Sequence, residues 1–158
     1  MHFFGNYLQR VDAKRRPVVP QKFRDQIGEA ELTKGLVITP GFDKCLFLFP
    51  ASLWEEVAGE LGSAHFSNFD TRTVQRLFLS QAMEVKVDGV GRISIPDPLR
   101  GLAGIEEEVL FVGVWNRIEL WCPSRWRAVT EPHQGQFEEL AEKLYGLLRE
   151  RDRKPNLS

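Results

Sequence analysis

The sequence predicts an α+β protein, mainly β with flanking helices, built from two tandem copies of one small unit. Two segments of the chain occur twice in the same order, and the second copy of the first segment alternates apolar and polar residues as a strand does. Other segments space their apolar residues as amphipathic helices do. The 158 residues are 42% hydrophobic and 27% charged, which is ordinary for a globular protein and excludes a disordered tail or a collagenous rod.

The internal repeat sets the predicted domain organisation. Residues 11–28 read VDAKRRPVVPQKFRDQIG and residues 87–104 read VDGVGRISIPDPLRGLAG, with six of 18 positions identical. A second match, LFLFPASLWEEV with IELWCPSRWRAV, follows at an offset of 72 rather than 76, so the first copy holds four extra residues near positions 28–34. The predicted domains are residues 1–82 and 83–150, related by a pseudo-twofold axis, with a flexible tail over 151–158.

The repeated motif predicts a strand–turn–strand hairpin. Each copy opens with a short strand that ends at Asp-x-x-x-Arg, over residues 12–16 and 88–92. In the second copy Gly89 and Gly91 favour a turn, because glycine adopts a positive φ at little cost. Residues 92–96 then alternate in the manner of a strand.

A short helix is expected after each hairpin. Pro96 ends the predicted strand, Asp97 suits the N-cap of a helix, and Pro98 suits its first position. The first copy repeats this arrangement, with a helix over residues 21–27.

The remaining elements follow in order along the chain. Apolar strands are predicted over residues 36–39, 45–49, 109–114 and 117–121. Each pair of strands leads into a helix that contains a Trp, over 51–61 and 123–130. Two longer amphipathic helices, over 69–82 and 136–150, have no counterpart in the repeat, and each is expected to close its own half.

Basic residues concentrate around the first motif. The window 10–24 holds six Lys and Arg against one Asp, a net charge of +5 in a chain whose total is −1, so the rest carries −6. The matching window, 86–100, carries only +1. A basic hairpin on an acidic body is typical of a nucleic-acid contact surface, because a two-stranded ribbon fits the major groove. The alternative is a solvated basic face in which Arg16 pairs with Asp12.

No cofactor, metal site or enzyme activity is predicted. His2, His65 and His133 are scattered and lack partners at metal-ligand spacing, and the sequence contains neither a nucleophile elbow nor a P-loop. Cys45 and Cys122 form no CxxC and are expected to be reduced thiols in a cytosolic protein. The longest apolar runs are too short to cross a bilayer, and the N-terminus lacks the features of a signal peptide.

The two motifs, DAKRRPVVP from Asp12 and DGVGRISIP from Asp88, resemble the paired Asp-x-x-x-Arg motifs of the MraZ family of bacterial transcriptional regulators. The resemblance extends to VQRLFLS, LFVGV and ELW and covers about residues 3–145. It implies two AbrB/SpoVT-like swapped-hairpin β-barrel halves and a closed homo-oligomeric ring. It also implies a nucleoid-associated cytoplasmic repressor, which binds tandem direct repeats in double-stranded promoter DNA of the division and cell-wall operon.

The resemblance also assigns the site residues, since the family contacts DNA through the Lys and Arg of this hairpin. These residues map to Lys14, Arg16 and Arg92, and Arg15, which departs from the family pattern, is added as a fourth candidate DNA-binding residue. The candidate structural residues of the motif are Asp12, Asp88 and Gly91, with the Asp side chains expected to accept turn amides or to hold the motif Arg.

The first copy departs from the family pattern at its turn. Arg15 stands where Gly91 keeps the usual glycine. Either Arg15 takes a positive φ, with a strain of about 1–3 kcal/mol, or the turn has another shape and Arg15 adds a phosphate contact. Pro17 points to an edge position or a bulge. Because Lys14 is matched by Val90, we predict that the first hairpin dominates DNA binding.

An alternative function is an antitoxin-type AbrB-like protein-interaction module. In that case the barrel would dimerise and the amphipathic helix over 136–150 would hold a partner protein. A small enzyme is the third hypothesis, and no motif in the sequence supports it.

Overall fold

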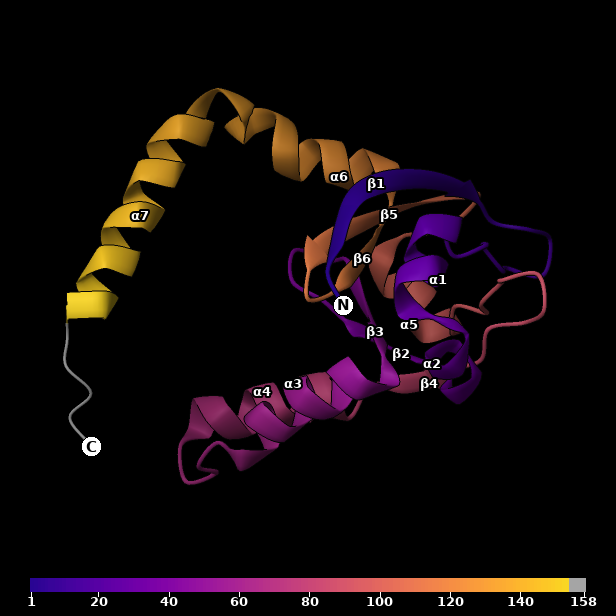
Figure 1. The fold of residues 1–158 in the computed structure, drawn as a ribbon, viewed down its shortest axis with the longest axis horizontal. Helices are drawn as coiled ribbons and strands as arrows, with labels where there is room; N and C mark the ends of the chain where they lie inside the picture. The colour runs from indigo at the N-terminus through magenta and orange to yellow at the C-terminus, as the bar shows by residue number, and fades with distance from the viewer. Residues whose placement is uncertain (154–158) are drawn as a thin grey trace. The chain divides into compact units, whose positions relative to one another are not determined.

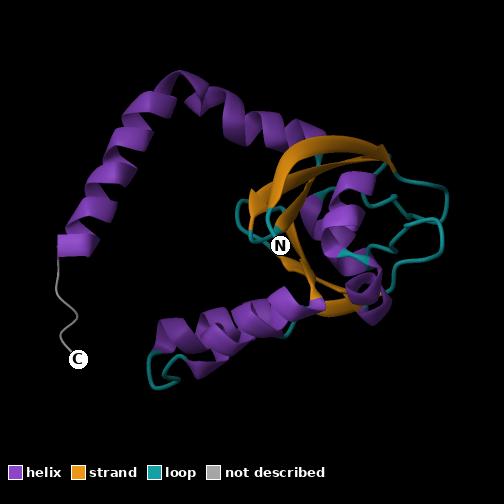
Figure 2. Ribbon diagram, in the orientation of Figure 1, coloured by secondary structure: helices purple, strands orange, loops and turns teal. Residues whose placement is uncertain are grey.

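The structure, a computed structural model, describes residues 1–153. Contacts divide the chain into two compact units, the first covering Met1–Pro123 and the second beginning at Ser124. The first unit contains a six-stranded antiparallel sheet with helices around it (Figures 1 and 2). The α+β class is confirmed, although more residues lie in helices than in strands. The boundary predicted at residue 82 separates the two copies of the sequence repeat, which is a different division, and it stays a prediction.

The strands and helices lie close to their predicted positions. The strands are β1 (Phe3–Arg10), β2 (Leu36–Pro40), β3 (Leu46–Pro50), β4 (Met83–Val85), β5 (Glu108–Trp115) and β6 (Ile118–Trp121). The helices of the first unit are α1 (Gln21–Ile27), α2 (Glu29–Lys34), α3 (Ala51–Ser63), α4 (Phe69–Leu79) and α5 (Asp97–Ala103). Helix α2 occupies the place where the first copy has its extra residues, and α4 ends before the predicted Ala82.

The two copies of the repeat exchange their first strands. The sheet order is β1-β5-β6-β3-β2-β4, and the sequence repeat matches β1, β2 and β3 with β4, β5 and β6. Strand β1 of the first copy therefore pairs with β5 of the second, and β4 of the second pairs with β2 of the first. If each strand is replaced by its counterpart in the other copy, the same order is obtained, read from the opposite edge. The sheet therefore has a pseudo-twofold axis between β3 and β6.

The sheet is not closed into the β-barrel halves that the family resemblance implied. Strands β1 and β4 lie at the two edges of one open sheet. Residues 92–96, predicted as a strand, form only a bridge between Val18 and Arg92. The physical reason lies in the facing segment, where Pro17 and Pro20 lack the N–H that a regular ladder needs.

The core fills the face of the sheet that α1 and α5 cover. Phe23 of α1 and Leu99 of α5 are buried there, and the ring of Phe23 makes edge contacts with Phe3 and Tyr7 of β1. Burying a side chain of this size contributes about 1.5–3 kcal/mol. The strands contribute Phe3, Leu36, Ile38, Leu46, Leu48, Val85, Val109, Phe111, Ile118 and Leu120. One continuous core thus joins both copies.

Helices α3 and α4 pack on aromatic side chains of β3. Phe47, Phe49, Trp54 and Phe78 contact one another with ring centroids 5.7–6.4 Å apart. Thr39 of β2 is fully buried, and its hydroxyl donates to the carbonyl of Phe78 at 3.0 Å. These contacts attach helix α4 to β2, β3 and α3 of the first copy.

The second unit is helical. It contains α6 (Pro123–Thr130), a 3-10 helix, η1 (Glu131–Gln136), and α7 (Phe137–Arg153). Helix α7 exposes the apolar side chains Phe137, Leu140, Leu144 and Leu147. It includes the first three residues of the expected tail, and residues 154–158 lie outside the described part of the chain. Within residues 1–153, none of the helices has the length and apolar character needed to span a membrane.

Gly113 of β5 is expected to be indispensable for the β1–β5 pairing. A Cβ there would lie 2.7 Å from the carbonyl carbon of Phe3 and would also meet the backbone nitrogen of Phe4. We expect Gly113→Ala to lower the free energy of unfolding by about 1–3 kcal/mol, because the backbone must move. Denaturant unfolding provides the measurement. The control is Gly59→Ala in α3, where the space is open and alanine should stabilise by about 0.5–1 kcal/mol. Equal stability of both variants would contradict this prediction.

Candidate nucleic-acid interface

The two Asp-x-x-x-Arg motifs form the same turn at one end of the first unit (Figure 1). In the first turn, the amide of Asp12 donates to the carbonyl of Arg16 at 3.2 Å, and the amide of Arg15 donates to the carbonyl of Asp12 at 2.9 Å. In the second, the matching bonds join Asp88 with Arg92 at 3.0 Å and Gly91 with Asp88 at 2.9 Å. The repeat in sequence is therefore a repeat in backbone geometry.

The carboxylate of Asp12 organises the first turn. Its Oδ1 accepts from the backbone amides of Lys14 and Arg16, both at 2.9 Å. Its Oδ2 accepts from Nε of Arg16 at 3.1 Å and lies 3.0 Å from Nη2 of the same guanidinium. One side chain thus satisfies two turn amides and also fixes the direction of the motif Arg.

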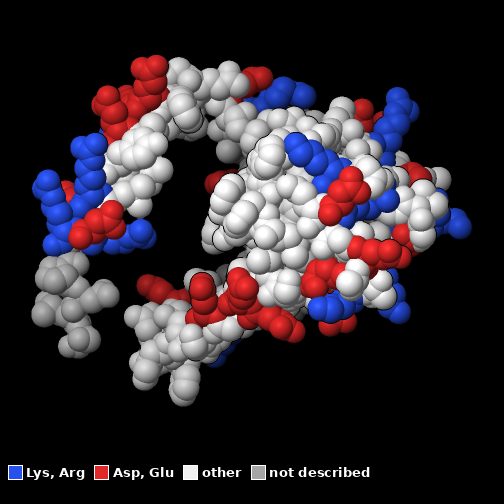
Figure 3. Space-filling model, in the orientation of Figure 1, with Lys and Arg blue, Asp and Glu red and all other residues white. Residues whose placement is uncertain are grey.

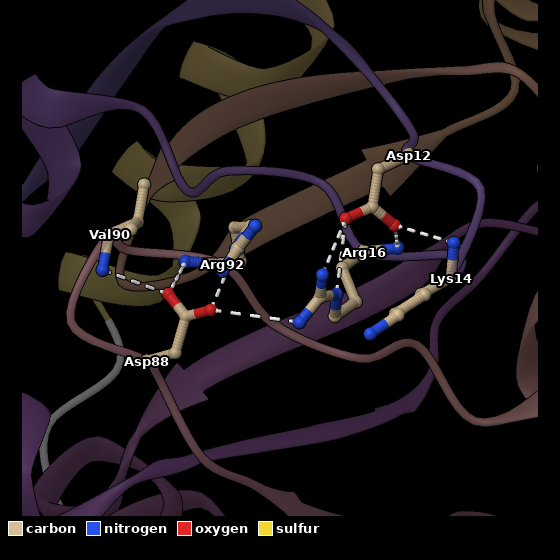
Figure 4. Close-up of polar contacts among 6 residues, drawn as sticks. All are labelled: Asp12, Lys14, Arg16, Asp88, Val90 and Arg92. Carbon is tan, nitrogen blue, oxygen red and sulfur yellow. Dashed lines mark hydrogen bonds and ion pairs between the residues drawn. The ribbon is translucent and has the colours of Figure 1, made fainter.

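Asp88 plays the same part in the second turn. Its Oδ1 accepts from the amides of Val90 at 3.0 Å and Arg92 at 2.9 Å, and its Oδ2 accepts from Nε of Arg92 at 2.7 Å. The same Oδ2 lies 4.0 Å from Nη1 of Arg16. Figure 4 shows the Arg16 guanidinium between the carboxylates of Asp12 and Asp88. The two turns are therefore joined electrostatically.

The extended segments after the turns fix them side by side. The amide of Val19 donates to the carbonyl of Gly91 at 2.8 Å, and the amide of Ile93 donates to the carbonyl of Pro17 at 3.0 Å. Pro17 itself forms an isolated bridge with Val11 and lies outside any regular strand. Val19 and Ile93 are fully buried, so the backbone beneath the turns is anchored in the core.

The hydrogen bonds keep both motif carboxyls ionised. The amide of Arg16, followed by its side chain, holds the pKa of Asp12 below its ordinary value, although partial desolvation opposes this. The amide and the guanidinium of Arg92 lower the pKa of Asp88 to about 2. Both turns therefore carry their full internal charge pairing at neutral pH.

The two turns present different side chains to solvent. Lys14 and Arg15 are exposed at the first turn, whereas the matching positions of the second are Val90 and Gly91. The side chains of the motif Arg residues, Arg16 and Arg92, are only 25% and 33% exposed. In the space-filling view, Lys and Arg at this end of the unit lie among acidic side chains (Figure 3). The first turn thus offers two outward cations that the second lacks.

Arg15 adopts the strained conformation that one of the two sequence interpretations required. Its φ is +63°, and Gly91 at the matching position has a φ of +93°. The side chain of Arg15 is held by an ion pair, with Nη1 2.8 Å from Oδ1 of Asp97. The prediction that Asp97 caps α5 was wrong, because the N-cap is Pro96 and Asp97 is the first helical residue.

Arg24 is a structural residue of the site, although in the sequence it stands out only as one of the six basic residues of the window 10–24. A Cβ on Gly91 would lie 2.6 Å from the guanidinium carbon of Arg24, so this side chain packs directly on the glycine. Arg24 is held by bonds from Nε to the carbonyl of Val19 at 2.9 Å and from Nη2 to Oε1 of Gln21 at 2.7 Å. Its identity with Arg100 in the repeat was the signal that could have marked it.

The arrangement offers hydrogen-bond donors and positive charge, and its carboxylates are already bonded within the turns. Ammonium and guanidinium groups of this kind bind phosphate oxygens, and guanidinium groups also bind guanine edges. Within residues 1–153, no three His, Cys, Asp or Glu side chains come together as a metal site.

Asp88→Asn is expected to change the pH dependence of stability. The pKa of Asp88 is about 2 in the folded chain against an ordinary 3.8, so its contribution is full above about pH 4 and is lost as the pH falls towards 2. The variant should unfold more easily than the wild type at neutral pH, and the difference should shrink over that acid range. Denaturant unfolding across pH 2–7 would measure it. A difference that stays constant across the range would contradict the prediction.

Comparisons with known proteins match both copies of the repeat. The family model described as "MraZ protein, putative antitoxin-like" matches twice, over residues 2–77 and 78–147. A transcriptional regulator MraZ from Acetivibrio thermocellus is 39% identical over 142 residues, covering 90% of this chain and 96% of its own. The same-named proteins of Carboxydothermus hydrogenoformans and Moorella thermoacetica are 36% and 39% identical, and cover 92% and 90% of this chain and 99% and 96% of their own lengths.

The resemblance drawn from the motifs is thereby confirmed. The family model covers both copies of the repeat, and each match contains one of the two Asp-x-x-x-Arg turns. The chain belongs to the MraZ family.

Proposed function

We propose that the chain is a transcriptional repressor that binds double-stranded DNA through the turn Asp12–Arg16. The observation that carries this proposal is the pair of exposed cations, Lys14 and Arg15, on a turn whose backbone is fixed by Asp12. Relatives named transcriptional regulators support it. We assign tandem direct repeats in the promoter of the division and cell-wall operon as the target, and the cytoplasm, in association with the nucleoid, as the place of action.

The four basic residues have different proposed roles. Lys14 and Arg15 are exposed and would neutralise phosphates, which supplies affinity without reading the base sequence. Arg16 and Arg92 are each held by a carboxylate. Such a fixed guanidinium loses little side-chain freedom on binding, so it is suited to the two hydrogen bonds that recognise guanine.

Assembly into a homo-oligomeric ring is the second part of the proposal. Strand β1 lies at an edge of the sheet and exposes Phe4 and Leu8, and Trp115 at the end of β5 is also exposed. Exposed apolar side chains on an edge strand favour protein–protein contacts. A ring would present many turns to repeated sites, so that individually weak contacts add through avidity.

Exchanging side chains between the two turns should shift DNA affinity. Lys14→Val gives the first turn the residue of the second, and Val90→Lys does the reverse. One lost phosphate contact should weaken binding by about tenfold at 0.1 M salt and reduce the log–log salt slope by about 0.9. Val90→Lys should act in the opposite direction. Fluorescence anisotropy with a labelled promoter duplex, and with its scrambled counterpart, would measure both.

Two outcomes would contradict the DNA-binding proposal. Absence of binding to either duplex at low salt would remove DNA as the partner. Loss of binding on Arg92→Ala without loss on Arg16→Ala would show that the second turn dominates. Circular dichroism of each variant controls for unfolding, because both Arg side chains also hold a turn carboxylate.

Leu8→Glu is expected to lower the mass of the assembly. Leu8 is 54% exposed on edge strand β1, where a buried charge would be costly in an interface. The control is Leu77→Glu, which is similarly exposed on α4. Light scattering coupled to size exclusion would give the mass. A fall with Leu77→Glu alone would contradict the assignment of the interface to β1.

A partner-protein function of the antitoxin type is the second candidate. It is favoured by the exposed apolar side chains of α7 and by the wording of the family description. A chain that fails to bind DNA would bring this candidate to the front.

A further inference from the structure

Arg15 reaches across the repeat boundary to an acidic side chain. Its Nη1 lies 2.8 Å from Oδ1 of Asp97, which is 82 residues away on α5. The two side chains are 54% and 71% exposed, so solvent reaches both partners of the pair. Asp97 Oδ1 also lies 3.5 Å from Nη2 of Arg100, which keeps the carboxylate at this end of α5.

The matching place beside the second turn carries no such charge. The repeat aligns Asp97 with Gln21 and Arg100 with Arg24, and Arg24 bonds to the neutral Oε1 of Gln21. The turn position next to it is Gly91, which has no side chain to hold. Gln21 in turn donates to Oδ1 of Asp25 at 2.6 Å, so on this side a neutral amide stands between Arg24 and the carboxylate of Asp25, whereas Asp97 pairs directly with the turn residue Arg15.

We propose that Asp97 competes with DNA phosphates for Arg15 and so sets the strength of DNA binding by the first turn. This inference rests on the proposed DNA-binding function. In the free protein the carboxylate occupies the guanidinium in the place of a phosphate. On binding, Arg15 must leave Asp97 to reach a phosphate, so the loss of this ion pair is subtracted from the free energy of DNA binding.

The exposure of the pair makes it suited to this role. An exposed ion pair adds little to stability and is screened by salt, so it opens without disturbing the fold. The hydrogen bond and charge of Arg15 hold the pKa of Asp97 below its ordinary value, so the competitor stays charged at neutral pH. Because phosphate contacts do not read sequence, Asp97 weakens binding to any duplex, which keeps a basic turn from adhering to DNA in general.

The sign of the effect separates this role from a positioning role. If Asp97 oriented Arg15 for a base contact, its removal would weaken binding to the promoter duplex. If Asp97 competes with phosphates, its removal strengthens binding to promoter and scrambled duplexes alike.

A double-mutant cycle tests the proposal on the full chain. The variants are Asp97→Asn, Arg15→Gly and their combination, and glycine is the residue that the second turn has at this position and that suits its positive φ. We expect Asp97→Asn to tighten binding to both duplexes about fivefold to tenfold at 0.1 M salt and to steepen the salt slope by about 0.9. In the Arg15→Gly background, removal of Asp97 should give no such gain. Glu56→Gln on α3 controls for the loss of one negative charge elsewhere.

The opposing outcomes are distinct. Unchanged or weaker binding by Asp97→Asn would overturn the inference and leave the proposed function standing. The same gain with and without Arg15 would also overturn it, because Asp97 would then act directly on the DNA. Absence of DNA binding in all variants would overturn the proposed function, and this inference with it. An NMR pH titration without DNA checks the pair itself, since the pKa of Asp97 should rise on Arg15→Gly.

Discussion

Exchange of first strands between the two repeats is the constraint on which the rest of the first unit depends. Strand β1 completes the sheet of the second copy and β4 completes that of the first. Phe3 of β1 therefore shares one core with Phe111 of β5, and neither copy can bury its apolar face alone. Because each turn directly follows an exchanged strand, the exchange also brings the two turns together, where the pairing of Val18 with Arg92 fixes their spacing.

Most of the charged groups of the two motifs bond to one another within the turns. Asp12 and Asp88 each accept hydrogen bonds from two backbone amides and one guanidinium, and Arg16 lies between both carboxylates. The net positive charge that remains at the surface comes from residues whose side chains the turn does not need, of which Lys14 is the clearest case. A count of basic residues along the chain overstates the charge available to a ligand, because several cations are already paired.

Much of the local structure could be predicted because the repeat supplies two independent copies of each pattern. Even the extra residues near position 28 were located by the change in offset, and they form α2. The barrel could not be predicted correctly from resemblance, because Pro17, a departure of this chain, removes a ladder donor opposite residues 92–96. Contacts between copies, such as Arg15 with Asp97 and Arg24 with Gly91, leave no periodic signal along one chain. The DNA-contacting roles of Lys14, Arg15, Arg16 and Arg92 stay predictions.

The shared sheet also affects which amino-acid substitutions the two turns can accept independently. A dimer of two separate single-repeat chains would carry identical turns, and any substitution would alter both at once. Here one covalent chain contains both halves of the symmetric sheet, so each half is free to differ. The pairs Lys14 and Val90, Arg15 and Gly91, and Gln21 and Asp97 are differences of this kind. Because both copies lie in one chain, the sheet keeps its symmetry while the two turns differ in sequence. A substitution that improves one turn therefore need not occur at the other.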